Sequence, residues 1–328
     1  MLHDDSKKNS RWSDYWEQGF ITSFGKAMPD NYSDDVKAFW FRQFEALEDG
    51  AVVLDLAAGN GAVAILAVEF SEKFTKRLSI LAADAAVISS HIVEDSKALN
   101  HYRNKIKFFS STPCEHLPFE EASVDLVCSQ FGIEYSYLPA SMPEVGRVLR
   151  AEGRFAARMH HQESVIVLDA VRDQSILKEA LYEHNIFDIL RQYFKVIGDT
   201  TDAASVQAAR QKSEVVNLER KLFGVVASLK KKYPGNESVE NFLGSINRFT
   251  MDHIGRPEKE RLAKLEDLLN SFRGTIERKQ DLQNAAMSQD DMIELQGLAV
   301  DSGFKDFSYE KNVNTSLKIN GWNVTAHM

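Results

Sequence analysis

The sequence predicts an α/β fold built on a mostly parallel sheet, and three observations lead to this prediction. Short apolar runs alternate with helical segments along the first half of the chain. Two of these runs end in an acidic residue, Asp55 and Asp84, and the first leads directly into two glycines. Strands that alternate with helices are joined by right-handed crossovers, which produce a parallel sheet. The ligands of such sheets bind beyond the carboxyl ends of the strands.

The apolar runs place the strands in chain order. The first, AVVLDLA at 51–57, is rich in β-branched residues, as is typical of a strand buried on both faces. A helix is expected at 62–74, and another at 143–153 that ends at Gly153. The remaining strands are expected at 78–84, 105–111, 123–131 and 153–161.

Composition limits the class of protein. The 328 residues, 44% of them hydrophobic, suit one large domain or two linked units. The net charge of -9 disfavours nucleic acid as a partner. Two cysteines, Cys114 and Cys128, make neither a disulfide framework nor a four-thiolate metal site, so no metal is expected. Because no apolar run reaches the roughly 18 residues of a membrane helix, we expect a cytoplasmic protein without membrane contact.

Gly59 and Gly61 lie where the first strand turns into its helix. Glycine permits a sharp turn there and leaves space for a ligand against the main chain, facing the N–H groups of the helix. A plain strand-to-helix turn also favours glycine, so both interpretations stay open. The spacing D-L-A-A-G-N-G from Asp55 matches neither a dinucleotide site nor a P-loop. It favours a ligand with an amino group, and Asp84 is placed to accept hydrogen bonds from a ribose diol.

Four segments within residues 50–160 carry motifs in succession: VLDLAAGNGAVAILA, LAAD, CEHLPFEEASVDLVCSQFGIEYS and EVGRVLRAEGRFA. Taken together they resemble the class I S-adenosylmethionine-dependent methyltransferases, in the variant with LPF, DLV and RVL motifs. AVDSGFKDFSYEKN and SLKINGWNVTAHM are similar to the family's final helix and antiparallel strand pair. The resemblance implies a Rossmann-like sheet of seven strands, one antiparallel, with S-adenosylmethionine as methyl donor and S-adenosylhomocysteine as product.

The resemblance also implies which residues hold the donor. Asp55 is expected to hold its methionine amino group and Asp84 its ribose hydroxyls. The further donor-binding residues are expected to be Ala57, Gly59, Asn60 and Gly61 in the corner, Ala85, Cys114 and Glu115 near the adenine, and Ser129 and Gln130 at the methionine end.

Two positions depart from the family's pattern. Ala57 stands where many members have their first glycine. Pro113 stands where many have an aspartate facing the adenine amino group. Because proline cannot accept that hydrogen bond, Glu115 or the backbone has to replace it.

The candidate catalytic residues are expected beside the transferred methyl group. Glu134 and Tyr135 follow the fourth strand, and His160 and His161 follow the fifth. Histidine titrates near neutral pH and suits a general base, but adjacent residues of an extended segment point opposite ways, so at most one faces the pocket. Each candidate could instead satisfy loop backbone. Methyl transfer depends largely on positioning, so a base is needed only where the acceptor loses a proton early.

The regions before and after this core are helical. Residues 1–45 form an expected cap, in which Tyr15 and Trp16 either wall off the donor from water or only dock on the sheet. Residues 46–164 form the donor-binding core. A helical insertion is expected at 165–285, acting as a lid over the acceptor, as a homodimer interface, or as both.

The insertion and the C-terminal segment carry local signals of their own. A helix opens at Pro257, and KKKYPGNES at 230–238 is expected to be a loop. Ser288 and Asp291 resemble a capping box that restarts the core fold, which 286–328 completes. We therefore expect an enzyme that methylates a small molecule by in-line displacement. The alternatives are a methyltransferase acting on tRNA or protein, and a non-catalytic module that binds the donor.

Overall fold

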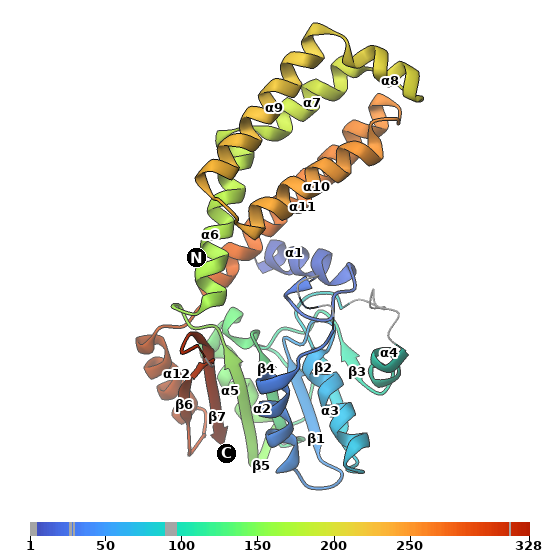
Figure 1. Ribbon diagram of the computed structural model, residues 1–328. Coiled ribbons are helices and arrows are strands. Elements are labelled where there is room, and N and C mark those ends of the chain that lie inside the picture. Colours follow the sequence, from blue (N-terminus) through green and yellow to red (C-terminus); the bar gives the residue numbers. More distant parts are fainter. Residues whose placement is uncertain (1–4, 26–27, 29, 89–96, 315) are drawn as a thin grey trace. The chain divides into compact units, whose positions relative to one another are not determined.

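The computed structural model describes residues 5–25, 28, 30–88, 97–314 and 316–328 (Figure 1). Its strands are β1 (Val52–Leu56), β2 (Ser79–Ala83), β3 (Lys107–Phe109), β4 (Val124–Gln130), β5 (Leu149–Met159), β6 (Ser308–Val313) and β7 (Ile319–His327). These seven described strands form one sheet in the order β3-β2-β1-β4-β5-β7-β6. Among them β7 alone runs against the others, antiparallel to both β5 and β6. The predicted seven-stranded sheet with one antiparallel strand is confirmed.

Helices cover both faces of this sheet (Figure 1). Those next to the sheet in sequence are α1 (Asp5–Glu17), α2 (Asp34–Glu45), α3 (Ala62–Lys73), α4 (Lys97–Arg103), α5 (Leu138–Val148) and α12 (Gln289–Asp301). One core packs α2 and α3 against the sheet and includes Val53 and Trp40. The other packs α5 and α12 and includes Leu54 and Leu295. Neighbours on β1 enter different cores because side chains alternate along a strand.

Several expected element boundaries are wrong, and the strand predicted at 153–161 is β5, which already begins at Leu149. The helix predicted at 143–153 is α5, which ends at Val148, because the chain from Leu149 already pairs with Val124 of β4. The strand predicted at 105–111 is shorter, since only Lys107–Phe109 pair with β2. Ends of elements depend on pairing partners that lie far away in the sequence, which local patterns do not report.

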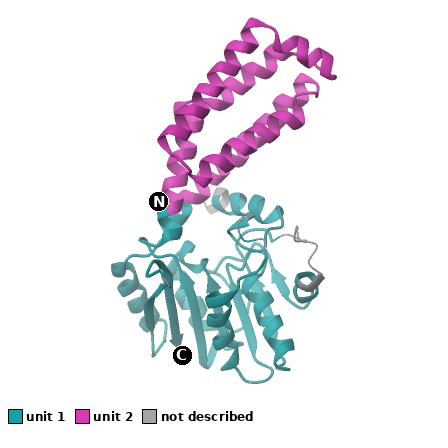
Figure 2. Ribbon diagram, viewed as in Figure 1, with its two compact units in different colours: residues 1–168, 281–328 teal, residues 169–280 magenta. Residues whose placement is uncertain are grey.

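The chain divides into two compact units, which Figure 2 shows in different colours. Unit 1 comprises residues 1–168 and 281–328, and unit 2 comprises residues 169–280. The helices that make up or enter unit 2 are α6 (Val165–Lys178), a π-helical turn (Glu179–Glu183), α7 (Ile186–Ile197), α8 (Ala203–Arg210), α9 (Ser213–Lys232), α10 (Glu237–His253) and α11 (Glu258–Ala285).

Unit 2 has an apolar core of its own, formed by the stripes of its helices. Arg261 of unit 2 is fully buried. Its guanidinium joins the segment after α10 to the segment after α7, because it donates to the carbonyl of Ile254 at 2.7 Å and to Thr200 Oγ1 at 2.9 Å. The helix expected to open at Pro257 does begin at Glu258, but the expected loop at 230–238 is shorter because α9 continues through Lys232. No described helix is both long enough and apolar enough to cross a bilayer.

The C-terminal part of unit 1 begins as predicted. Ser288 and Asp291 form the expected capping box of α12, with the Ser288 hydroxyl accepting from the backbone N–H of Asp291 at 3.1 Å. Just before it, the backbone N–H of Met287 donates to the carbonyl of His160 at 2.8 Å. The chain that returns from α11 is thereby hydrogen-bonded to the end of β5.

Candidate functional site

A cavity of about 1360 Å³ lies in unit 1, where the strands β1, β2 and β4 end. Asp55 of β1, Asp84 directly after β2 and Gln130 at the end of β4 all line it. Residues of α1 and the last turn of α11 add to its wall. This is the edge at which mostly parallel sheets hold ligands.

Gly59 forms the corner between β1 and α3. Its φ of +52° belongs to the left-handed region, which glycine adopts without strain. A Cβ atom at this position would lie 2.3 Å from the nearest atom of the Trp16 ring, so only glycine fits beneath the indole. Its backbone N–H donates to Asp84 Oδ2 at 2.7 Å. The corner is therefore held by a carboxylate on one side and covered by the N-terminal helix on the other.

Gly59, Asn60 and Gly61, all expected to bind the donor, are absent from the described lining of the cavity. Gly61 packs against strand β3, since a Cβ there would lie 2.9 Å from the ring of Phe108. The side-chain amide of the buried Asn60 donates to the carbonyls of Trp16 at 3.0 Å and Phe20 at 2.8 Å. All three residues shape the corner, and Asn60 attaches the N-terminal segment to it.

Asp55 and Asp84 are buried carboxyl groups facing the same cavity. Asp55 Oδ2 accepts from the backbone N–H of Ala64 at 3.0 Å, and Asp84 Oδ1 accepts from that of Ala86 at 2.7 Å. Burial raises the pKa of Asp55 to about 8 and that of Asp84 to about 6. Burial disfavours the charged carboxylate, so a cationic ligand at this site would be strongly favoured.

Glu134 lies on the short 3-10 helix η2 (Ile133–Tyr135) that follows β4, and it lines the cavity. Its Oε1 accepts from the backbone N–H of His160 at 2.9 Å, while its Oε2 is buried without a hydrogen-bond partner among the described residues. Burial raises the pKa of Glu134 to about 7. Tyr135 also lines the cavity, and burial raises the pKa of its phenol well above the usual value.

His160 and His161 point to different neighbours, as their positions on an extended segment predict. His160 stacks on the ring of Phe131 with centroids 4.3 Å apart, and burial lowers its pKa to about 3. His161 packs on Trp322 with centroids 4.5 Å apart, and its Nδ1 accepts from the backbone N–H of Glu163 at 2.9 Å. Neither ring is among the described residues that line the cavity.

The residues expected near the adenine line the cavity together. They are Ala85, Pro113, Cys114 and Glu115. Cys114 is buried, which raises the pKa of its thiol, so it is a neutral wall at physiological pH. Glu115 Oε1 accepts from the backbone N–H of Tyr137 at 2.7 Å.

Ala57 lines the cavity as well, but Ser129 and Tyr15 do not belong to its described lining. The Ser129 hydroxyl donates to the carbonyl of Leu56 and accepts from the backbone N–H of Ile133, both at 2.9 Å. The hydroxyl of Tyr15 donates to the carbonyl of Thr22 at 2.9 Å. These contacts give both residues structural partners within the fold.

The structure adds lining residues that the sequence did not indicate. Arg11 of α1 donates to Asp281 of α11, with Nη2 3.1 Å from Oδ2, and both line the cavity. The edge of the Trp12 ring meets Tyr135, with centroids 5.8 Å apart, and Tyr32 lines the same space. Arg11 and Asp281 are far apart in sequence, and neither belongs to a motif, so no sequence signal pairs them.

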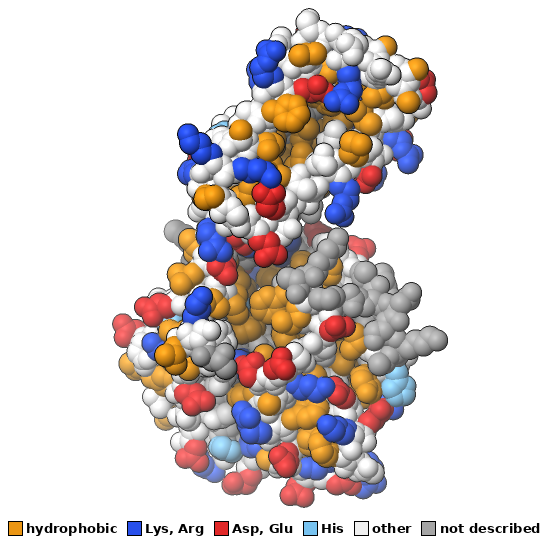
Figure 3. All heavy atoms as spheres, in the orientation of Figure 1, with side chains coloured by type: hydrophobic (Ala, Val, Ile, Leu, Met, Phe, Trp, Pro, Cys, Tyr) orange, Lys and Arg blue, Asp and Glu red, His pale blue; other side chains and the backbone are white. Residues whose placement is uncertain are grey.

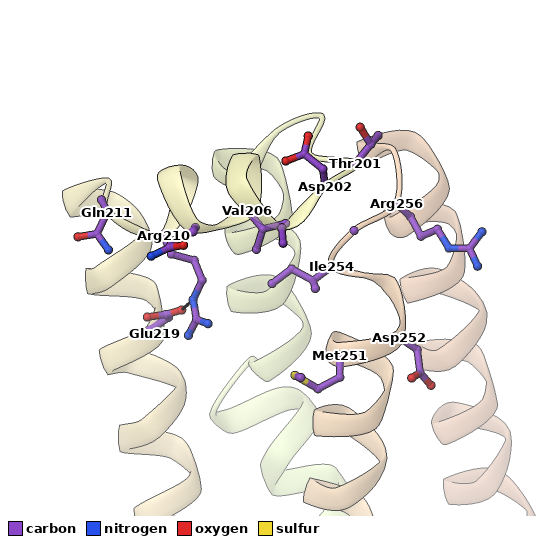
Figure 4. A pocket seen from close by; sticks show the side chains of 13 residues that line it. Thr201, Asp202, Val206, Arg210, Gln211, Glu219, Met251, Asp252, Ile254 and Arg256 are labelled. Atoms are coloured by element: carbon purple, nitrogen blue, oxygen red, sulfur yellow. Dashed lines mark hydrogen bonds and ion pairs between the residues drawn. The ribbon is translucent and has the colours of Figure 1, made fainter.

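A second cavity of about 710 Å³ lies within unit 2 (Figure 4). There Arg210 and Glu219 point toward each other from α8 and α9, with Arg210 Nε 2.9 Å from Glu219 Oε1. Among the described residues, no buried polar atom without a partner belongs to its lining. The described part of the chain also has no cluster of three or more His, Cys, Asp or Glu suited to a metal ion.

Comparison with known proteins assigns the region around the first cavity. Residues 50–157 match the model of a family described as "Methyltransferase domain". The ubiquinone/menaquinone biosynthesis C-methyltransferase of Brucella anthropi is 31% identical over 126 residues, 38% of this chain and 46% of that protein. Its counterpart in Geotalea uraniireducens is 26% identical over 143 residues, 43% of this chain and 55% of that protein. The matches thus span about half the length of these relatives.

Among solved structures, phosphoethanolamine N-methyltransferase 2 of Haemonchus contortus in complex with S-adenosyl-L-methionine matches 97% of this chain and 59% of its own. The identity is 14% and the TM-score is 0.36, which is too low to add to the assignment.

The matched residues carry the chemistry of the cavity. They include Asp55, Asp84 and Glu134, three buried carboxyl groups that suit a cationic ligand, and Gln130, whose buried Nε2 has no described partner. S-adenosylmethionine carries a sulfonium and an ammonium group, so the donor set fits it. Residues 50–157 therefore form a methyltransferase domain, and its buried carboxyl groups fit S-adenosylmethionine as the methyl donor.

Proposed function

We propose that this protein transfers a methyl group from S-adenosylmethionine to a small-molecule acceptor. The observation that carries the proposal is that Asp55, Asp84 and Glu134 line one cavity inside the region matched by a methyltransferase domain. When bound, the donor supplies an electrophilic methyl group on its sulfonium. The residues of the chain then have two tasks: they hold the donor and they receive the proton of the acceptor.

Asp55 and Asp84 are the residues that we propose to hold the donor. Both are buried and have raised pKa values. The ammonium group of the donor beside Asp55 offsets the cost of burying charge there, and Asp84 accepts hydrogen bonds from the ribose hydroxyls. Ala85, Cys114 and Glu115 are proposed to flank the adenine, and Trp16 to cover the corner at Gly59. Pro113 lines the same wall without offering an acceptor from its ring, so Glu115 is the side chain there that can accept from the adenine amino group.

Glu134 is the residue that we propose as general base. Its Oε1 is fixed by the His160 N–H, which leaves Oε2 for the acceptor. A pKa of about 7 matches the working pH and favours proton transfer. The acceptor atom bonds to the methyl carbon while the carbon–sulfur bond breaks. The proton of the acceptor passes to Glu134 Oε2, and S-adenosylhomocysteine leaves. His160, with a pKa of about 3, is neutral and positions Glu134 through its backbone.

The cavity supports an acceptor of moderate size. Its volume of about 1360 Å³ exceeds the roughly 300–1,000 Å³ of ordinary ligand pockets, so donor and acceptor fit side by side. Trp12, Tyr32 and Phe131 line it and favour a planar or apolar acceptor. The curated relatives are named for C-methylation in ubiquinone and menaquinone biosynthesis, which is consistent with an acceptor of that kind.

For unit 2 we propose a role in covering the acceptor or in forming a homodimer, within the cytoplasm. The support is that α11 continues from unit 2 into unit 1, where its last residues Asp281, Asn284 and Ala285 line the cavity. In addition, hydrophobic side chains gather on the face of unit 2 seen in Figure 3. The exposed large hydrophobic residues of unit 2 include Val216, Phe223 and Met251. On unit 1 in the same view, basic and acidic side chains are interspersed, which supports a partner other than nucleic acid (Figure 3).

The test uses the full chain and S-adenosylmethionine labelled in its methyl group. A cell extract is separated into small molecules, RNA and protein, and each fraction is assayed for label. We expect label in the small-molecule fraction. Label in RNA or protein would replace the proposed acceptor class, and donor binding without transfer to any fraction would make the protein a non-catalytic binding module.

A further inference from the structure

Gln130 and Trp40 form a buried pair beside the cavity. The indole Nε1 of Trp40, on α2, donates to the side-chain Oε1 of Gln130 at 2.8 Å. Trp40 is fully buried and Gln130 is 9% exposed. Gln130 lines the cavity, and its Nε2 is buried without a hydrogen-bond partner among the described residues.

Trp40 sets the orientation of the Gln130 carboxamide. An indole N–H can only donate, so it must meet the oxygen of the amide. The NH₂ group is therefore turned away from Trp40, and it has no hydrogen-bond partner among the described residues although Gln130 lines the cavity. Trp40 itself is held by aromatic packing, at 4.9 Å between centroids from Phe39 and at 6.4 Å from Phe44. A buried amide donor without a partner is costly, so a ligand atom that accepts its hydrogen bond is favoured.

We infer that Trp40 is a positioning residue that makes Gln130 a fixed hydrogen-bond donor toward the cavity, so that the ligand group recognised there is an anionic or carbonyl oxygen and not an amine. This inference rests on the proposed function, because it concerns the same cavity. The oxygen has two sources. It belongs either to the carboxylate of the methyl donor or to the methyl acceptor.

Two substitutions test the presence of the Gln130 amide and its orientation separately. Gln130→Met keeps the length of the side chain and removes the amide. Trp40→Phe keeps an aromatic ring in place and removes the N–H, so the amide can turn over. If both orientations become populated, only a fraction of the molecules remains competent and the apparent affinity falls by that fraction.

The probes are S-adenosylmethionine and decarboxylated S-adenosylmethionine, measured by calorimetry. If the oxygen is the donor's carboxylate, Gln130→Met raises the Kd for the first about tenfold or more and leaves that for the second unchanged. Trp40→Phe raises the Kd about two- to fivefold. The double variant matches Gln130→Met alone, because Trp40 acts only through the amide.

Trp322→Phe is the matched control. It also removes a buried indole hydrogen bond, from Nε1 to the carbonyl of Met287 at 3.0 Å, and it is not in the described lining. We expect it to lower the melting temperature and leave the Kd for both probes unchanged. A general loss of packing would instead affect the Kd in all three variants.

The remaining outcomes are equally decisive. In one outcome, Gln130→Met binds the donor as tightly as wild type but needs a several times more concentrated small-molecule fraction to reach half-maximal labelling. The recognised oxygen then belongs to the acceptor. If neither measurement changes, or if Trp40→Phe weakens binding as much in the Gln130→Met background, the inference is overturned. A wild-type chain that binds the donor and transfers no label refutes the proposed function alone, since the two donor probes still test Gln130.

Discussion

Asp84 holds the turn at Gly59, because its Oδ2 accepts a hydrogen bond of 2.7 Å from the Gly59 backbone N–H. Its Oδ1 accepts from the backbone N–H of Ala86 at the same distance. Each carboxylate oxygen has a second lone pair, so the group can hold the corner and still accept from a ligand hydroxyl. Structure and binding therefore depend on one side chain.

Asp84→Ala is expected to lower both stability and donor affinity. Losing the bonds that hold the corner should reduce the free energy of unfolding by about 1–3 kcal/mol, and the Kd for S-adenosylmethionine should rise at least tenfold. Urea unfolding and calorimetry measure the two effects. Asp125→Ala is the control, because Asp125 Oδ2 accepts from the Val52 N–H at 2.7 Å at the other end of β1. It should lower stability alone; an unchanged Kd in Asp84→Ala would contradict the assignment.

The buried carboxyl groups predict how stability depends on pH. Burial raises the pKa of Asp55 to about 8 and that of Asp84 to about 6, against about 3.9 in an unfolded chain. Between these values the folded protein binds more protons than the unfolded chain. The contribution of these groups is therefore fully present below about pH 4 and is lost as the pH rises through 6 and 8. Urea unfolding of wild type and Asp55→Asn at several pH values isolates the contribution of Asp55 to the pH dependence of the free energy of unfolding.

Donor binding should show the opposite trend with pH. A cation favours the ionised carboxylates, so affinity for S-adenosylmethionine should rise between pH 6 and 8, with protons released on binding. S-adenosylhomocysteine keeps the ammonium group and lacks only the sulfonium charge, so its affinity should follow the same trend with a smaller change. Calorimetry in two buffers of different ionisation enthalpy counts the released protons. Equal pH dependence for both compounds would argue against a sulfonium near these carboxyl groups.

Glu134→Gln should lower kcat by about a hundredfold or more, the usual range for loss of a general base. The glutamine can still accept from the His160 N–H, so the fold and the donor Kd should stay close to wild type. Wild-type kcat/KM should rise with pH around 7, where Glu134 ionises, and the variant should lose that inflection. Steady-state rates from pH 5.5 to 8.5 provide the test; full activity in Glu134→Gln would leave positioning as the source of catalysis.

Gly59→Ala tests the cover that Trp16 places over the corner. The added methyl group would meet the indole, so Trp16 has to move, and we expect changed tryptophan fluorescence and weaker donor binding. Gly50→Ala is the matched control for Gly59→Ala, because Gly50 also has a positive φ, +87°, but has nothing within 4 Å of the added carbon. It isolates the strain of a left-handed residue. Trp16→Ala in the Gly59→Ala background should recover stability, and no recovery would mean that the clash is relieved elsewhere.

The sheet could be predicted from local sequence because each strand carries its own signal. AVVLDLA is apolar and β-branched, and its Asp55 and the following Gly59 mark the edge at which ligands bind. The same reasoning placed α5 too late, because Leu149 becomes strand only through pairing with Val124 of β4. Pairing between distant segments is information that a local pattern lacks.

The site was only partly predictable for the same reason. Motif residues such as Asp84 and Glu115 line the cavity, but Gly61 and Ser129 have partners inside the fold. The direction in which a side chain points is set by its neighbours in space. Trp40 and Gln130 are 90 positions apart, so the hydrogen bond that orients the amide has no trace in either segment alone.

The last prediction concerns unit 2, residues 169–280, which we expect to serve the acceptor and not the donor. Replacing these residues with a short Gly/Ser linker keeps Asp281 and every other lining residue of the cavity. Donor affinity should therefore stay within a few-fold of wild type. Turnover should collapse if the unit closes over the acceptor, because closure positions the substrate and excludes water.

Three measurements on the linker variant distinguish the outcomes: donor calorimetry, turnover and the mass in solution. Circular dichroism first establishes that the sheet is folded. Retained turnover with a change from dimer to monomer would make unit 2 an interface and not a lid. Loss of donor binding in a folded variant would mean that unit 2 shapes the donor site, because the carboxyl groups of Asp55 and Asp84 are still present.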